Sequence, residues 1–331
     1  MNVTFFSTQA YDRRSFDEHN RDYAFNIKYL DVQLNEQTAA LAKGADAVCA
    51  FVNDRINGTI MRHLSDAGVK VIALRCAGFN NVDLAAAKQF NLKVVRVPAY
   101  SPNAVAEHAV AMIMALNRKT HKAYNRIREQ NFSLNGLLGF DLHGKTVGVI
   151  GTGNIGMVFC RIMLGFGCKV VAFDVQENEH LTASGVQYLP LNEVLSASNI
   201  ISLHCPLNEH TRYIINQDSI EKMQEHVMLI NTSRGGLIDT KAVVKGLKSG
   251  KIGSLGIDVY EQEEDLFFRD LSDTIIEDDV ISRLSSFPNV LITAHQGFFT
   301  KEALAEIAET TLSNLKAFKN GEKLVNEIQM K

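Results

Sequence analysis

The sequence predicts an α/β protein made of two doubly wound parallel sheets, with one domain inserted into the other. Three observations in the 331 residues lead to this fold class. Short apolar runs of β type alternate with helical stretches, a glycine-rich turn at residues 151–156 joins a strand to a helix, and a further helix follows after the second sheet is complete. The length is typical of about two domains.

The composition excludes several classes of partner. The net charge is -3 and the pI is about 6.4, so the chain has no basic stripe to bind nucleic acid or an anionic membrane. Residues 1–10 lack the pattern of a signal peptide, and the most apolar stretch, 104–116, is short and interrupted by Glu107 and His108. We therefore expect a cytoplasmic protein.

The five cysteines lie in or beside apolar runs and include no C-x-x-C pair. Small buried thiols are typically placed in this way. The sequence therefore predicts neither a disulfide framework nor a metal site.

The first hundred residues contain five runs of β type, separated by helical or polar stretches. Spacings of about twenty residues indicate βαβ connections and therefore a parallel sheet. The expected strands are residues 2–6, 26–30, 47–52, 69–74 and 93–97. This region has no glycine loop for phosphate binding.

A breaker segment with the sequence V-P-A-Y-S-P, residues 97–102, ends the first part of the chain. Ser101 can cap and Pro102 can open the next helix. We expect that helix to cover residues 103–131 and to cross into the second domain.

Residues 145–174 read as one βαβ unit around a G-x-G-x-x-G motif. Its first strand leads into Gly151, and apolar residues at helical spacing then continue to Gly167. Gly151 permits a tight turn, Gly153 lets the backbone approach a pyrophosphate, and Gly156 lets the helix pack closely on the strand. The N–H groups at the start of the helix then face the phosphates.

Asp174 ends the second strand of this unit, where a carboxylate can accept hydrogen bonds from the adenosine ribose. Val175 and Gln176 follow, and no arginine is placed there to receive a 2′-phosphate. The sequence therefore predicts NAD, and not NADP, as the cofactor.

Six strand-like runs with interleaved helices make up the second sheet, as a complete Rossmann fold requires. They are residues 146–150, 169–173, 199–203, 227–230, 252–257 and 290–293. A helix at 300–320, capped by Thr300, begins after the sixth strand, so we expect the chain to return to the first domain. The predicted domains are residues 1–100 with 299–331, and an NAD-binding domain at 101–298.

Ligands of open α/β sheets lie beyond the carboxyl ends of the strands, and two candidate residues fall there. Arg234 precedes a helix start, where the helix dipole disfavours a cation, which suggests that it grips a bound anion such as a carboxylate. The alternative is an ion pair within the protein. His295 follows the sixth strand, and imidazole titrates near neutrality, as a proton donor to a carbonyl must. The alternative is a histidine satisfied by packing.

The acidic run at 261–265 follows the fifth strand. Such a run is usually a solvated loop, but one of its carboxylates can instead pair with His295 and fix the orientation of the ring. The spacing does not decide which carboxylate this is.

With these motifs, the chain resembles the D-2-hydroxyacid dehydrogenases, and within them most closely the fermentative NAD-dependent D-lactate dehydrogenases of bacteria. The resemblance covers essentially the whole chain. It is carried by residues 73–83 (ALRCAGFNNVD), 95–100 (VRVPAY), 151–156 (GTGNIG), 202–207 (SLHCPL), 231–236 (NTSRGG) and 256–261 (GIDVYE).

The resemblance implies that the first domain is a flavodoxin-like substrate (catalytic) domain. It implies that His295 protonates the carbonyl oxygen, Glu263 is the carboxylate paired with His295, and Arg234 clamps the substrate. The amide groups of Ala77 and Gly78 would hold the substrate carboxylate. The positions implied to shape the small pocket are Phe51, Tyr100 and Phe298. Besides the three glycines and Asp174, the positions implied to bind the cofactor are Asn154, Ile155, Cys205, Pro206, Thr232, Ser233 and Asp258.

The expected function is the reversible, NADH-dependent reduction of a small 2-ketoacid, pyruvate, to D-lactate. Phe51 and Tyr100 suggest a compact apolar wall, and no nearby Lys or Arg cluster invites a substrate phosphate. One alternative is a dehydrogenase for a bulkier ketoacid such as 2-ketoisocaproate or phenylpyruvate. The other alternative is an NAD-sensing binding protein similar to transcriptional corepressors. The presence of all three catalytic residues favours an enzyme over this alternative.

The resemblance also implies a homo-oligomer, either a dimer or a tetramer, formed through the nucleotide domain. One face of the helix expected at 103–131 carries apolar residues, and we expect this face to contact a second subunit. Its residues are Val105, Ala109, Met112 and Ala115. The alternative is that this face packs on its own sheet.

Overall fold

The structure is a computed structural model that describes residues 1–329. The chain divides into two compact units, one of Met1–Ser101 with Phe298–Lys331 and one of Pro102–Gly297. These limits differ by one residue from the predicted domain limits. Residues 330 and 331, which the prediction includes in the first domain, lie outside the described residues.

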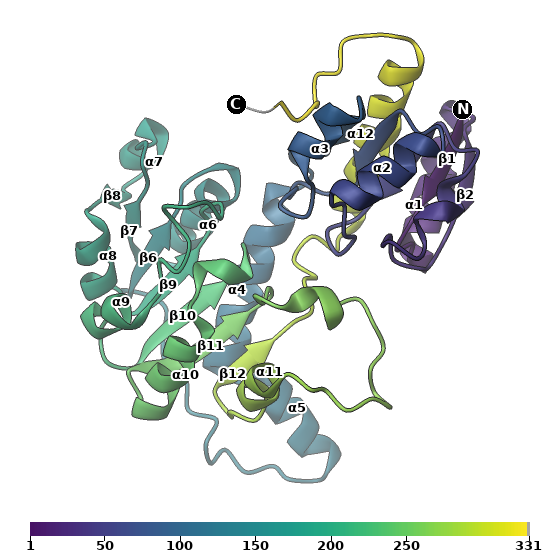
Figure 1. The fold of residues 1–331 in the computed structure, drawn as a ribbon. Coiled ribbons are helices and arrows are strands. Elements are labelled where there is room, and N and C mark those ends of the chain that lie inside the picture. The colour runs from purple at the N-terminus through teal and green to yellow at the C-terminus, as the bar shows by residue number, and fades with distance from the viewer. Residues whose placement is uncertain (330–331) are drawn as a thin grey trace. The chain divides into compact units, whose positions relative to one another are not determined.

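The first unit contains a five-stranded parallel sheet (Figure 1). Its strands are β1 (Asn2–Phe5), β2 (Asn26–Tyr29), β3 (Ala47–Ala50), β4 (Val71–Leu74) and β5 (Lys93–Arg96). Its helices are α1 (Ala10–His19), α2 (Gly58–Asp66), α3 (Leu84–Gln89) and α12 (Lys301–Lys319), with short 3-10 turns η1 (Asn20–Asp22) and η2 (Ala39–Ala42). The strand order is β2-β1-β3-β4-β5, and the central strands β3 and β4 are buried at every residue, as in a parallel sheet covered on both faces.

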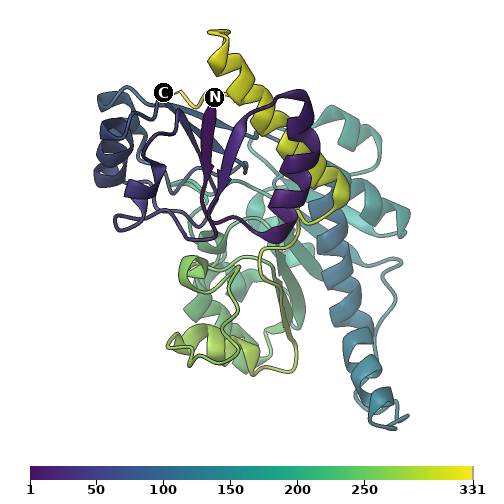
Figure 2. The same cartoon turned by 90° about the vertical axis from the view of Figure 1, so that its right-hand side faces the viewer.

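Helix α12 belongs to the first unit although it follows the second unit in the sequence. Thr300 caps it, because its Oγ1 accepts a hydrogen bond from Ala303 N at 3.2 Å. The helix packs against β4, β5 and α1, and Figure 2 shows it, in yellow, beside the purple α1. The predicted helix at 300–320 and its cap are confirmed.

The strand predicted at 47–52 ends two residues early, at Ala50. The reason is a side chain: Phe51 N donates to Asp54 Oδ2 at 2.6 Å instead of extending the sheet ladder. The end of β3 is therefore set by the buried carboxylate of Asp54 and not by the β propensity of the residues that follow.

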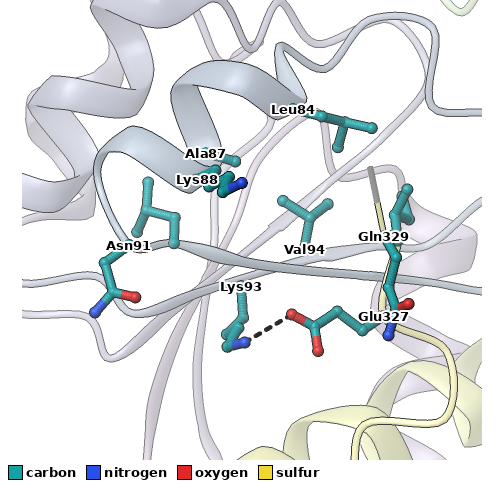
Figure 3. Close-up of a pocket in the computed structure, with 10 residues that line it drawn as sticks. Leu84, Ala87, Lys88, Asn91, Lys93, Val94, Glu327 and Gln329 are labelled. Atoms are coloured by element: carbon teal, nitrogen blue, oxygen red, sulfur yellow. Dashed lines mark hydrogen bonds and ion pairs between the residues drawn. The ribbon is translucent and has the colours of Figure 1, made fainter. Parts of the chain in front are cut away.

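The C-terminal segment covers the free edge of β5. Ile328 N donates a hydrogen bond to Val94 O at 2.9 Å, and Lys93 forms an ion pair with Glu327 at 2.8 Å, drawn as the dashed line in Figure 3. A cavity of about 400 Å³ lies between this segment, β5 and α3. A covered edge strand is protected from pairing with another chain.

The second unit contains a seven-stranded parallel sheet. Its strands are β6 (Thr146–Ile150), β7 (Lys169–Phe173), β8 (Gln187–Tyr188), β9 (Ile200–Leu203), β10 (Val227–Asn231), β11 (Ile252–Ile257) and β12 (Val290–Ile292). Its helices are α4 (Pro102–Arg118), α5 (Thr120–Arg128), α6 (Asn154–Gly165), α7 (Glu179–Ala183), α8 (Leu191–Ala197), α9 (Gln217–Lys222), α10 (Thr240–Ser249) and α11 (Asp279–Ser285), with 3-10 turns η3 (Gly235–Leu237) and η4 (Glu263–Asp265).

The order of this sheet is β12-β11-β10-β9-β6-β7-β8. Strand β6 pairs with both β7 and β9, so the chain direction across the sheet reverses there, and a ligand crevice is expected at that point. The six predicted strands are present. The prediction missed β8, whose two residues are too few to show a periodicity.

The helix predicted at 103–131 is broken into α4 and α5 at Lys119, which has φ 52° and ψ 34°. Tertiary contacts hold the break. Asn117 Nδ2 donates to Phe140 O at 2.7 Å, and Phe140 N donates to Asn117 Oδ1 at 2.8 Å, so a distant segment is tied to the end of α4. Pro102 opens α4 as predicted.

The predicted subunit contact on α4 is wrong. Val105, Ala109 and Met112 are buried and Ala115 is half-buried. Ala109 and Met112 belong to the core of the second unit, because α4 packs on α6, β10 and β11. The alternative reading, that this face packs on its own sheet, is correct.

Candidate active site

The glycine-rich turn at 151–156 leaves β6 and starts α6. Gly151 has φ +94°, and a Cβ on it would overlap the chain that follows β9, so only glycine fits. A Cβ on Gly156 would overlap the carbonyl group of Gly151, which reflects close packing of α6 on the turn. Gly153 faces open space and leaves room for a phosphate group at the start of α6.

Asp174 stands at the end of β7, next to this turn. Its Oδ2 accepts hydrogen bonds from Thr152 N at 2.5 Å and Thr152 Oγ1 at 3.1 Å. Thr152 Oγ1 also accepts one from Tyr188 OH at 2.9 Å. Sequence reasoning missed Thr152 and Tyr188, although a hydroxyl between two glycines of the motif was a signal for the first.

The other predicted cofactor residues lie around the same edge of the sheet. Asn154 and Ile155 form the start of α6, where helix N–H groups lack partners within the helix. Cys205 is buried after β9, and Pro206 follows it in an exposed position.

Thr232 and Ser233 follow β10 and approach the chain after β9. Ser233 Oγ donates to Cys205 O at 2.7 Å. Thr232 Oγ1 is buried and meets no hydrogen-bond partner among the described residues. Because buried hydroxyl groups are normally paired, this orphan group fits a polar atom of a bound dinucleotide. Together with the glycine turn and Asp174, these residues fit NAD.

His295 and Glu263 are in direct contact. His295 Nδ1 lies 2.8 Å from Glu263 Oε1, and Tyr260 N donates to Glu263 Oε2 at 2.9 Å. An ionised carboxylate only accepts hydrogen bonds, so the proton of this contact belongs to Nδ1, and Nε2 is available for other chemistry. The ring is therefore held in one orientation.

Two carboxylates of the acidic run at 261–265 have different hydrogen-bond partners. Glu261 accepts hydrogen bonds from Tyr213 OH and Thr240 Oγ1, both at 2.7 Å, and is thereby occupied at the start of α10. The carboxylate that meets His295 is that of Glu263. The structure thus distinguishes two carboxylates that spacing could not, and the one in contact with His295 is the one that the resemblance implies.

Arg234 lies on the loop after β10, the strand next to β11, whose loop carries Glu263. Its Nη1 donates to Ser233 O at 2.7 Å, and its own carbonyl accepts from Asn231 Nδ2 at 2.8 Å. The residue as a whole is half-buried. These two hydrogen bonds anchor the backbone of the loop after β10. The other N–H groups of the Arg234 guanidinium can donate to an anionic ligand.

Asp258, a predicted cofactor residue, ends β11 and is 1% exposed. Its carboxylate accepts from Gln296 N at 2.9 Å and Gly297 N at 2.8 Å, and its carbonyl accepts from His295 N at 2.7 Å. Burial alone would raise the pKa of Asp258, but hydrogen bonds involving His108 and Thr293 outweigh burial and hold the pKa below its usual range. The carboxylate is therefore ionised.

The three predicted pocket residues gather in the first unit. The Phe298 ring centroid lies 6.1 Å from that of Phe51 and 6.3 Å from that of Tyr100. Ala77 and Gly78 follow β4, and their carbonyl groups accept from Arg96 Nη1 at 2.7 Å and Cys76 Sγ at 3.3 Å respectively. The backbone at the predicted carboxylate-binding amides is thus anchored.

A buried charged network ties together the loops at this edge of the first sheet. Asp54 accepts from Ser7 Oγ at 2.7 Å and Phe51 N at 2.6 Å. Arg75 Nη2 donates to Ser7 O at 2.7 Å and to Asp12 Oδ2 at 3.3 Å. The Arg75 guanidinium also lies 4.7 Å from the centroid of the Phe51 ring. Sequence reasoning missed this network.

The remaining expectations concern metals, thiols and membranes. All five cysteines are free and buried. Within residues 1–329, no group of three or more His, Cys, Asp or Glu side chains is arranged to hold a metal ion. In the same range, no helix combines the length and the hydropathy that a bilayer span requires.

The chain is similar in sequence to a known protein family and to a known enzyme. Residues 110–297 match the family described as D-isomer specific 2-hydroxyacid dehydrogenase, NAD binding domain. The chain is 51% identical over 328 residues to the D-lactate dehydrogenase of Escherichia coli (strain K12), covering 99% of this chain and 100% of that one.

Two solved structures extend the comparison. The pyruvate reductase of Chlamydomonas reinhardtii matches with a TM-score of 0.94 and 45% identity, covering 98% of both chains. D-2-hydroxyisocaproate dehydrogenase matches with a TM-score of 0.85 and 30% identity, covering 99% of both chains. The similarity extends over the whole fold, both units included.

Proposed function

The chain belongs to the D-isomer-specific 2-hydroxyacid dehydrogenases, which are NAD-dependent oxidoreductases, and from this premise we propose that it reduces pyruvate to D-lactate. The observation that carries the proposal is the 2.8 Å contact between His295 Nδ1 and Glu263 Oε1. An imidazole held through one nitrogen can give a proton from the other to a carbonyl oxygen. The names of the Escherichia coli and Chlamydomonas reinhardtii relatives support this pair of substrate and product.

The proposed reaction needs a hydride, a proton and a clamp. When bound, NADH supplies the hydride for the carbonyl carbon. His295 gives its Nε2 proton to the carbonyl oxygen, while Glu263 holds the ring in place. Arg234 polarises the carbonyl group and helps to hold the carboxylate, for which its planar group is suited. The resemblance assigns the binding of the substrate carboxylate to the amide groups of Ala77 and Gly78 as well.

The pocket residues favour a small side chain on the ketoacid. Phe51 and Phe298 are each 7% exposed, and their rings pack with that of Tyr100. A wall of three aromatic rings suits the methyl group of pyruvate. The similarity to D-2-hydroxyisocaproate dehydrogenase supports the second candidate, a branched-chain ketoacid.

A ketoacid panel tests the proposal. NADH oxidation is measured with pyruvate, 2-ketobutyrate, 2-ketoisocaproate, phenylpyruvate and hydroxypyruvate, and the product is resolved on a chiral column. We expect the highest kcat/KM with pyruvate and a D-lactate product. A higher kcat/KM with a bulky ketoacid would overturn the substrate assignment alone. No turnover with any of them would overturn the proposed reaction and favour the NAD-sensing role.

We also propose that the protein is a homo-oligomer and that the α5 arm, residues 120–140, contacts a second copy. The arm is labelled at α5 in Figure 1 and carries apolar side chains that are 39% to 88% exposed. They are Tyr124, Ile127, Phe132, Leu134, Leu138 and Phe140. Several exposed apolar side chains in one segment are typical of an interaction site, and a cavity of about 510 Å³ lined by Leu134 and Leu138 can receive a side chain of the partner.

Charges placed on the arm are therefore expected to dissociate the oligomer. Light scattering should give two or four times the chain mass of 36.7 kDa for the natural protein, and 36.7 kDa for Leu134→Lys with Leu138→Lys. Ile275→Lys is the matched control, because Ile275 and Leu138 are both 88% exposed. A natural mass of 36.7 kDa, or an oligomer that persists in the double variant, would contradict the assignment.

A further inference from the structure

A polar cluster on the second unit links Asp258, a predicted cofactor residue, to two residues that have no part in the proposed reaction. It joins His108 on α4 to Thr293, which follows β12, and to Asp258, which ends β11. His108 Nε2 lies 3.1 Å from Thr293 Oγ1 and 3.4 Å from Asp258 Oδ1, and Thr293 Oγ1 lies 2.6 Å from Asp258 Oδ1. Helix α4 packs directly on β11 and β12, which Figure 1 also shows.

The direction of these hydrogen bonds follows from the number of protons. The Thr293 hydroxyl has one proton, and the ionised Asp258 carboxylate can only accept, so Thr293 donates to Asp258. Thr293 Oγ1 must then accept the remaining hydrogen bond, which means that His108 donates from Nε2. The hydrogen bonds therefore run in one direction, from His108 to Thr293 and from Thr293 to the Asp258 carboxylate.

Asp258 in turn holds the backbone that carries His295. It accepts the N–H groups of His295, Gln296 and Gly297, the first through its carbonyl and the others through its carboxylate. His295 has φ 53°, a left-handed conformation that is uncommon for residues other than glycine. Such a conformation persists only where the surroundings enforce it.

We propose that His108 and Thr293 are positioning residues for His295. They polarise and orient the Asp258 carboxylate, which keeps residues 295–297 in the conformation that aims the His295 ring. Glu263 orients the ring through its side chain, whereas this cluster orients it through the backbone. The inference rests on the proposed function of His295 as the proton donor, and it adds two residues to which no role in the reaction is assigned.

Paired variants test the proposal. Thr293→Val removes the hydroxyl and Thr293→Ser keeps it; His108→Leu removes the donor and His108→Gln supplies an amide donor in its place. We expect kcat with the best ketoacid to fall about tenfold in Thr293→Val and His108→Leu, since small misplacements of a reacting group are costly. The solvent deuterium isotope effect on kcat should rise in these two variants, because proton transfer becomes slower.

Thr293→Ser and His108→Gln should restore kcat to within about threefold, and the NADH Kd should change less than about twofold in all four variants. Equal losses in the conservative and the disruptive variants would overturn the proposal, because a general structural defect would then explain them. A weakened NADH Kd with unchanged kcat would also overturn it, since the cluster would then serve cofactor binding.

A second measurement does not depend on turnover. In protein labelled with ¹³C-histidine, the His295 ring signal is identified by its loss in His295→Gln. We expect this signal to move in Thr293→Val and to keep its position in Thr293→Ser. An unmoved signal would overturn the inference even if the protein reduces no ketoacid. A moved signal in an inactive protein would support the positioning role while the proposed function fails.

Discussion

Replacing His295 with glutamine is expected to lower kcat/KM for pyruvate about 100- to 10,000-fold, the usual contribution of a general acid. Glutamine cannot deliver a proton at neutral pH, although it can still form a hydrogen bond. NADH affinity should change less than about twofold, because the His295 side chain is not among the predicted cofactor contacts, and Asp258, the predicted contact beside it, bonds the backbone of residues 295–297 and not the His295 ring. Steady-state kinetics and a fluorescence titration with NADH give the two values.

Two controls separate the loss of the proton donor from other effects. His295 has φ 53°, which asparagine tolerates better than glutamine, so His295→Asn should lose as much activity without added backbone strain. His180→Gln removes an exposed histidine and should leave kcat/KM unchanged. Turnover of His295→Gln within tenfold of the natural protein, with NADH bound normally, would remove His295 from the proposed mechanism.

The features that the sequence predicts well are those set by local chemistry. The glycine turn has a backbone that only glycine adopts at Gly151, and its three glycines lie within six consecutive residues. Thr300 caps α12 through a hydrogen bond to a residue three positions away. Short apolar runs separated by helical stretches likewise predict the two parallel sheets, because each βαβ unit is a local motif.

The features that the sequence does not predict depend on contacts between distant residues. The break at Lys119 is held by two hydrogen bonds between Asn117 and Phe140, so helical periodicity continues across a position where the helix stops. Without the resemblance, nothing in the sequence chooses Glu263 over Glu261 as the neighbour of His295, because the choice follows from the partners that occupy Glu261. Spacing within the acidic run has no information about those partners.

The candidate site also combines residues that local sequence features predict with residues that only long-range contacts reveal. The strand ends indicate where Arg234 and His295 lie, because parallel strands bring their carboxyl ends to one edge. Residues that support the site, such as His108 and Thr293, come from elements 185 positions apart and carry no motif. Their role becomes visible only in the distances between side chains.

The charged network of the first unit leads to the largest expected change in stability. Arg75 is 1% exposed, forms an ion pair with Asp12 at 3.3 Å, and its charge also acts on the buried Asp54 carboxylate. Arg75→Met keeps an apolar stem but leaves both carboxylates without their charge partner. Breaking a buried ion pair in this way costs about 3–5 kcal/mol, so we expect the free energy of unfolding to fall by that amount. Urea denaturation at neutral pH measures it.

The matched control is Arg62→Met, which removes an exposed arginine from α2 and should change the free energy of unfolding by less than about 0.5 kcal/mol. A loss below about 1 kcal/mol in Arg75→Met would show that the carboxylates do not depend on this cation.

The dependence on pH gives a second, independent test of the same network. Burial raises the pKa of Asp54 above its usual value, and the charge of Arg75 opposes this effect. Without Arg75 the pKa of Asp54 should rise further in the folded state, while in the unfolded state it stays ordinary. Such a group stabilises the fold when protonated, and this stability is lost as the pH rises through the folded-state pKa. The deficit of Arg75→Met relative to the natural protein should therefore shrink as the pH falls from neutrality, whereas a defect of packing alone would stay constant.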